Sequence, residues 1–262
     1  MRNPKIEFDE LQLYFGEPYT VNVGESENKI KCLQPTIGKI VRMGEKKFYQ
    51  TLNIFITNTT SYRLPLWRMG KDWNVMSDYE LFINLLPMAE QPVLDLLFED
   101  FKMDNLTLHK YELEDGTSSV VIYDTKNEVY FDETVYHHVS QYFRNVFNTF
   151  PEEKFTDQAI MKKWFIRKDE NEERNNATKK ENGTYKEGSI QAVISACVNH
   201  PGFKYDVRQL MDVGVCEFYD SVQRLQVYEN TTALLKGMYG GFLDTSKLSK
   251  NPDTYNFMKS IK

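Results

Sequence analysis

The sequence predicts an α+β protein. Its N-terminal half combines helices with small antiparallel β elements, its C-terminal half is all-helical, and a charged helical arm or linker joins the two. Short alternating segments bounded by turn residues occur only in the first half. Apolar residues at three- and four-residue spacing dominate residues 189–262. Between the halves, residues 167–188 carry six cations, six anions and almost no apolar side chain.

The composition is that of an ordinary soluble globular protein. The 262 residues include 32 Lys+Arg against 38 Asp+Glu, a net charge of −6, and 41% are hydrophobic. A disordered chain is excluded, because 17 Phe, 16 Tyr and 3 Trp carry too much apolar ring area to leave in water. The acidic balance argues against nonspecific binding of nucleic acid, which requires an excess of cations.

Two further features bear on the compartment. No run of about 18 apolar residues occurs, and the first residues lack the apolar core of a secretory signal, so we expect no membrane partner and a cytoplasmic location. The three cysteines are odd in number and widely spaced, which favours buried free thiols over a disulfide framework.

The first third of the chain alternates β segments with helices. Residues 11–15, 19–23 and 29–33 are predicted as strands around turns. Pro35 suits the first turn of a helix that continues to about Thr57. Gly38 and Gly44 weaken this helix, which makes sense if another backbone packs closely there.

The middle third continues the same mixture. Residues 66–73 are predicted as a loop of large side chains, and Ser77 with Glu80 forms a capping box for the next helix. Pro87 ends that helix. The remaining predictions are a short helix at 92–98, a β-meander at 106–113, 119–123 and 128–131, and a helix that begins at Asp132.

The last third is predicted to be helical. Thr156 is taken as the cap of a helix that leads into the charged stretch 167–188, which is either a solvated helical arm or a flexible linker. Further helices are predicted at 190–198, 205–213, 215–236 with Gly237 as the C-terminal cap, and 253–261. The predicted division is an α+β domain at 1–151, a helix with charged linker at 152–188 and a helical domain at 189–262.

Residues that could carry chemistry are few. Ser195, His200 and Asp206 are the residue types of a hydrolase triad, but Ser195 lies within a predicted helix and lacks the sharp turn that exposes a nucleophile. Cys197 with His200, and Glu133 with His137, could each form half of a metal site, and neither has a second pair at a zinc spacing. We therefore expect no catalytic, cofactor-binding or metal-binding residues, and no enzyme.

Residues 205–224 admit a DNA-binding interpretation, because a short helix, Gly214 and a longer helix follow one another. The start of the longer helix carries Glu217 and Asp220, whereas a recognition helix needs Arg, Lys, Asn or Gln there. An antiparallel helix pair without a role in DNA binding is the preferred interpretation.

Large side chains in predicted loops are the candidate partner-binding residues. Trp67, Met69 and Trp73 lie in the richest aromatic loop, and Tyr239 and Phe242 flank a glycine turn near the C-terminus. Aromatic side chains in loops are common anchors of protein interfaces. The alternative is that they cover the protein's own core.

Three stretches together resemble a known family. They are QPTIGKIVRMGEKKFY at 34–49, LWRMGKDWNVMSDYELF at 66–82, and DSVQR at 220–224 followed by TTALLKGMYGGFLD at 231–244. They are similar to proteins encoded in tail-gene clusters of long-tailed phages and prophages of Gram-positive bacteria, over most of the chain. No catalytic residues come with the resemblance.

The resemblance implies a role in tail morphogenesis. The first hypothesis is an assembly chaperone in the host cytoplasm that binds a tail-tube, tape-measure or baseplate subunit. The alternatives are a structural component of the baseplate or tail in the virion, and a DNA-binding regulator. The sequence leaves open the partner, the oligomeric state, including a homo-oligomer, and whether residues 167–188 are helical.

Overall fold

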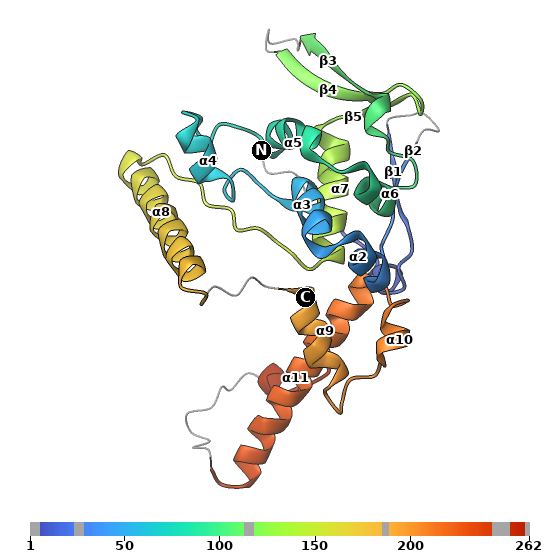
Figure 1. Ribbon diagram of the computed structural model, residues 1–262, viewed down its shortest axis with the longest axis vertical. Coiled ribbons are helices and arrows are strands. Elements are labelled where there is room, and N and C mark those ends of the chain that lie inside the picture. The colour runs from blue at the N-terminus through green and yellow to red at the C-terminus, as the bar shows by residue number, and fades with distance from the viewer. Residues whose placement is uncertain (1–5, 24–28, 113–117, 185–188, 243–251, 260–262) are drawn as a thin grey trace.

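The computed structural model describes residues 6–23, 29–112, 118–184, 189–242 and 252–259. It confirms the α+β class, with a helical C-terminal region (Figure 1). The helices are α1 (Glu10–Tyr14), α2 (Ile37–Met43), α3 (Glu45–Ile56), α4 (Arg63–Arg68), α5 (Asp78–Leu85), α6 (Gln91–Leu97), α7 (Glu133–Val146), α8 (Ala159–Glu181), α9 (Ile190–Val198), α10 (Val207–Leu210) and α11 (Val215–Tyr239). The strands are β1 (Tyr19–Asn22), β2 (Lys29–Cys32), β3 (Leu106–Glu112), β4 (Ser118–Asp124) and β5 (Val129–Phe131). Short 3-10 turns are η1 (Leu86–Met88), η2 (Met103–Asn105) and η4 (Pro252–Tyr255).

The N-terminal prediction is partly wrong. Residues 10–14 form the short helix α1, where a strand was expected, because the Asp9 carboxylate accepts the backbone N–H groups of Leu11 and Gln12 and caps a helical turn. The two following strands are confirmed: β1 and β2 pair antiparallel, with Val21 opposite Ile30.

The helix expected from residue 35 to 57 is broken at Gly44. Gly44 has a φ of +93°, which a residue with a side chain rarely adopts, and it separates α2 from α3. Gly38 has the other function expected of these glycines. A Cβ atom at Gly38 would lie 2.5 Å from the carbonyl oxygen of Met211, so a second backbone does pack closely there.

The main core forms around α3 and α7. The ring of Phe55 in α3 contacts Phe82 of α5, Phe98 after α6 and Phe143 of α7, with centroids 5.2 to 6.0 Å apart. All four rings are buried, and such aromatic pairs stabilise a core beyond the area they bury. The capping box of Ser77 and Glu80 is confirmed at the start of α5.

The C-terminal helices share this core, so apolar packing continues across the predicted division at residue 188. Ile190 of α9 and Val215 and Phe218 of α11 are buried in the same apolar cluster as α3 and α7. The first N–H groups of α2, from Ile37 and Gly38, donate to the carbonyls of Val213 and Met211, both at 3.0 Å. These groups have no partner within α2 itself, so the C-terminal segment completes that helix start.

The charged stretch is helical as far as Glu181, which decides between the two expectations for it. α8 begins at Ala159, and Thr156 is not its cap, because residue Gln158 occupies that position. The described part of residues 167–188 has no fully buried side chain, as expected. α8 nevertheless packs against α4. Ile166 of α8 joins three other residues in a small separate apolar cluster, which consists of Leu64, Leu66, Trp73 and Ile166.

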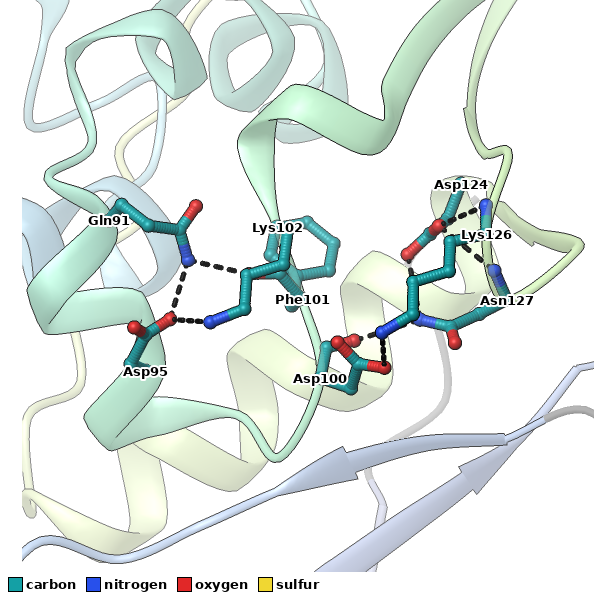
Figure 2. A network of polar contacts seen from close by, with 8 residues as sticks. All are labelled: Gln91, Asp95, Asp100, Phe101, Lys102, Asp124, Lys126 and Asn127. Atoms are coloured by element: carbon teal, nitrogen blue, oxygen red, sulfur yellow. Dashed lines mark hydrogen bonds and ion pairs between the residues drawn. The ribbon is translucent and has the colours of Figure 1, made fainter.

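The β-meander is confirmed, with strand order β3-β4-β5. Polar contacts join its base to α6 and to the segment that follows α6 (Figure 2). Lys126 in the β4–β5 turn donates to Asp100, Asn127 donates to the carbonyl of Asp100, and Lys102 donates to Asp95 on α6, all within 3.0 Å. The outer parts of β3 and β4 extend away from the helices at the top of Figure 1.

The bounds of the C-terminal helices differ from the predicted ones. α11 continues past the expected cap at Gly237 to Tyr239, and residues 207–210 form only one turn of the expected helix 205–213. The expected helix at 253–261 is also wrong for the described residues, where only the 3-10 turn η4 forms. Residues 260–261 of that prediction lie outside the described part.

No helix among the described residues is long and apolar enough to cross a membrane. All three cysteines are buried thiols, as the sequence predicts. Burial raises the pKa of the Cys32 and Cys197 thiols, so both stay protonated near neutral pH.

We expect Cys32, Cys197 and Cys216 to resist Ellman's reagent in the native protein and to react fully in denaturant. Only the thiolate is the nucleophile, and burial keeps the reagent away from all three thiols. The measurement is the release of the coloured thiolate with time. Rapid reaction of one thiol in the folded protein would show that its surroundings open.

Candidate partner-binding site

The predicted aromatic loop divides into a buried and an exposed part. Trp73 is fully buried, and its indole N–H donates to the carbonyl of Lys154 at 3.1 Å. Trp67 lies on α4, within a helix and not in a loop, with 39% of its surface exposed and its ring centroid 6.3 Å from that of Trp73. Met69 is 63% exposed. Trp73 therefore belongs to the protein's own core, and only Trp67 and Met69 remain available to a partner.

Ion pairs fasten α8 beside these residues. The guanidinium of Arg63 donates twice to the carboxylate of Asp169, both at 2.5 Å, and the two side chains are 12% and 20% exposed. Arg68 and Glu173 form a second paired contact, which is half-exposed. Because bidentate Arg–carboxylate pairs fix orientation as well as distance, they set the position of α8 on α4.

A third contact fixes the beginning of α8. The ammonium of Lys162 donates to the carboxylate of Asp72 in the α4–α5 connection. Burial alone would raise the pKa of Asp72, but Lys162 and the N–H groups of Asn74 outweigh it and hold that pKa below its usual value. The connection that carries Met69 is therefore anchored between two helices.

The other predicted pair lies at the far end of α11. Tyr239 and Phe242 are each 87% exposed. Gly241 has a φ of +68°, the N–H of Phe242 donates to the carbonyl of Gly237, and the N–H of Gly241 donates to that of Met238. These two bonds make a Schellman motif, so Gly241, and not Gly237, occupies the left-handed position that ends the helix.

The two groups do not form one site. α4 lies beside α8 on the left of Figure 1, whereas α11 runs to the bottom of the view, away from the helices of the main core. The structure therefore presents two separate ring-bearing surfaces. We call them the α4 surface (Trp67 and Met69) and the α11 tip (Tyr239 and Phe242).

A third aromatic surface was missed from the sequence. On one face of the meander, the ring of Tyr123 lies 5.3 Å from that of His109 and 4.7 Å from that of Tyr130. Tyr130 is 50% exposed and Tyr111 of β3 is 44% exposed. The signal was present, because alternation in a strand places residues 107, 109 and 111 on the same face.

The residues of the considered hydrolase triad are engaged separately. Asp206 caps α10 by accepting the N–H groups of Arg208 and Gln209. His200 accepts the N–H of Gly202 on Nδ1, and its Nε2 lies 3.6 Å from Glu229. Ser195 lies in the middle of α9, as expected, but it is exposed and does not pack against the core.

Metal and DNA sites receive no support from the described residues. No group of three or more His, Cys, Asp or Glu side chains among them is placed to hold a metal ion. At the start of α11, the side chains of Val215, Cys216 and Phe218 are buried in the core. These first turns of α11, which a recognition helix would insert into a major groove, instead pack against the core.

Two surface hollows lie along α11. One, of about 240 Å³, is bordered by α1, α7 and α11, and the other, of about 560 Å³, lies between α11 and residues 202–204. Tyr14, Asp220 and Arg224 border both. Arg224 also donates to the carbonyl of Lys259, which ties the C-terminal segment to α11. Both hollows lie toward the core end of α11, apart from the α11 tip.

Comparison of the chain with protein-family profiles, curated proteins and solved structures gives no match.

Proposed function

We propose that this chain is a non-enzymatic phage tail-morphogenesis protein that acts as an assembly chaperone. It binds a tail subunit or the tape-measure protein in the host cytoplasm through exposed aromatic side chains and then leaves. The observation that carries the proposal is the α11 tip, where two ring-bearing side chains are held in solvent at the end of a 25-residue helix.

The α11 tip has the properties of a binding anchor. Binding becomes more favourable when a partner covers a large apolar side chain that is held in water. Tyr239 and Phe242 are each 87% exposed. The Schellman motif fixes the backbone beneath them, so little ordering is required when a partner binds. Aromatic anchors of this kind supply much of the energy of protein interfaces.

The binding energy expected from these exposed side chains suits a transient complex. Burial of one such ring contributes about 2 kcal/mol, or about 30-fold in the dissociation constant. Two rings at the α11 tip, with Trp67 and Met69 on the α4 surface, give enough energy for recognition without an extensive interface. A chaperone must release its subunit to the growing tail, so moderate affinity is required of it.

The experiment is co-expression of the chain with single tail genes. We expect the chain to raise the soluble yield of one tail subunit and to co-purify with it. The double variant Tyr239→Ser/Phe242→Ser should weaken that complex at least about 100-fold, because two buried rings are lost. Its thermal unfolding should be unchanged, because both side chains lie in solvent.

A matched control separates anchor chemistry from general surface polarity. Ile160 and Met88 are 82% and 73% exposed and lie outside both proposed surfaces. The variant Ile160→Ser/Met88→Ser should bind the subunit like the native chain. Equal loss in both double variants, or a subunit yield that does not depend on the chain, would contradict the proposal.

A further inference from the structure

The strand β3 has an open edge. It lies at one side of the three-stranded sheet, and no second strand pairs with it among the described residues. All residues from 107 to 111 are exposed, including Leu108 at 63% and Tyr111 at 44%. An open edge presents a row of unpaired N–H and C=O groups to any strand that can approach it.

The ladder with β4 identifies which groups face outward. The N–H of Thr125 donates to the carbonyl of Asn105, so these two residues form a hydrogen-bonded pair. Antiparallel ladders alternate, and Thr107 opposite Tyr123 and His109 opposite Val121 are the next such pairs. Residues 106, 108, 110 and 112 therefore direct their backbone N–H and C=O groups away from β4.

Polar contacts fix the base of the meander to which β3 belongs. Figure 2 shows the contacts that fix the base of the meander, where Lys126 and Asn127 bind Asp100 while Asp124 accepts the N–H groups of its own turn. β3 extends from this base beyond the helices at the top of Figure 1. The outer part of β3 therefore lies apart from the helices (Figure 1).

We propose that β3 pairs antiparallel with β3 of a second copy of this chain, which joins two three-stranded sheets into one six-stranded sheet. The two-fold axis passes beside His109, so His109 lies opposite His109 of the other copy. Leu108 and Lys110 lie opposite each other in both directions, and each such pair exchanges two backbone hydrogen bonds. The contact uses the same surface on both copies, as a closed dimer requires.

The side chains select this register. It pairs all seven residues of β3, and it places the stem of Lys110 against Leu108 and Tyr111 against Thr107. A shift that centres the axis on Lys110 places two ammonium groups directly opposite each other, which is destabilising. A shift that centres it on Leu108 leaves Tyr111 and residue 112 without partners in the strand.

The first test is the oligomeric state. Sedimentation of the full chain should show a monomer–dimer equilibrium, and hydrogen exchange of the amides of Leu106, Leu108 and Lys110 should slow as the concentration rises. Leu108→Pro removes an outward N–H in both copies and should weaken the dimer at least about tenfold. Leu108→Ala keeps that N–H and should leave the dimer largely intact.

The second test reports on the register and does not require proline in the strand. His109→Cys should form a disulfide between copies under mild oxidation, because a residue on the axis faces itself at a non-hydrogen-bonded pair with Cα atoms about 4.5 Å apart. Thr107→Cys is the control: its own mate lies four positions away along the partner strand, and it should not cross-link. The native cysteines are buried and give no background.

Three results would overturn the inference. A chain that stays monomeric at every concentration excludes the contact. A dimer that neither responds to Leu108→Pro nor cross-links through His109→Cys uses another surface. Protection of the β3 amides that appears only after a tail subunit is added assigns the edge to that partner and not to a second copy.

Discussion

Gly38→Ala is expected to lower the free energy of unfolding by about 3 kcal/mol. The new methyl group would lie 2.5 Å from the carbonyl oxygen of Met211, a backbone atom that cannot rotate away. To make room, α2 must move from the segment before α11 and lengthen the hydrogen bond from Gly38 N–H to that carbonyl. Denaturant unfolding followed by circular dichroism measures the change.

Gly214→Ala is the matched control. Gly214 lies in the same contact, opposite Thr36, but it has a φ of −64° and no heavy atom within 4 Å of an added Cβ. Its substitution should change stability by less than about 1 kcal/mol, because the lower entropy of the unfolded chain offsets a poorer helix cap. Equal stability of the two variants would show that α2 and the C-terminal segment do not pack as described.

Asp169→Asn is expected to cost about 2 kcal/mol and to release α8 from α4. The change removes the charge opposite Arg63, whose guanidinium is only 12% exposed and would be left partly buried without a counterion. Glu173→Gln is the control, because the Arg68–Glu173 pair is half-exposed and contributes at most about 1 kcal/mol.

Tryptophan fluorescence isolates this effect. The chain has three tryptophans, Trp67, Trp73 and Trp164, and all of them lie on α4, on α8 or between the two in the small cluster. In Asp169→Asn, emission should shift to longer wavelength at denaturant concentrations that leave the circular dichroism unchanged. Coincident transitions would show that the α4–α8 unit unfolds only with the main core.

Local signals predicted most of the elements. The capping box at Ser77, the second meander turn at 124–127 and the helix beginning at Asp132 each depend on residues within a few positions of one another, and the structure confirms all three. The first meander turn, at 114–116, lies outside the described residues. The incorrect strand prediction at residues 10–14 also depends on neighbouring residues alone. Alternating apolar residues outweighed the cap at Asp9, although a single turn of helix needs little more than that cap.

Contacts between distant residues could not be predicted. Arg63 and Asp169 are 106 positions apart, and nothing in the charged stretch 167–188 indicates that Asp169 binds Arg63. The contact across residue 188 could not be predicted for the same reason, since the N–H groups of Ile37 and Gly38 find their acceptors beyond residue 210. Gly38 was the one local sign of that contact.

The candidate site shows the same limit. The sequence around Trp67 and Trp73 does not distinguish them. Trp67 is partly exposed to solvent, whereas Trp73 is enclosed by α8 and by residues near Lys154. The exposure of Tyr239 and Phe242 was easier to predict, because the glycine pair between them indicates a turn whatever surrounds it. The meander rings were overlooked, although the alternation of β3 places them together.

We propose that this chain binds a tail subunit during assembly and then departs. Quantitative mass spectrometry of purified particles, beside the unassembled fraction of the same infected cells, tests it most directly. We expect the chain to be present with a tail subunit in the unassembled fraction and absent from the particles. Its presence in particles at a fixed ratio to baseplate or tail proteins would contradict departure and make it a structural component of the virion.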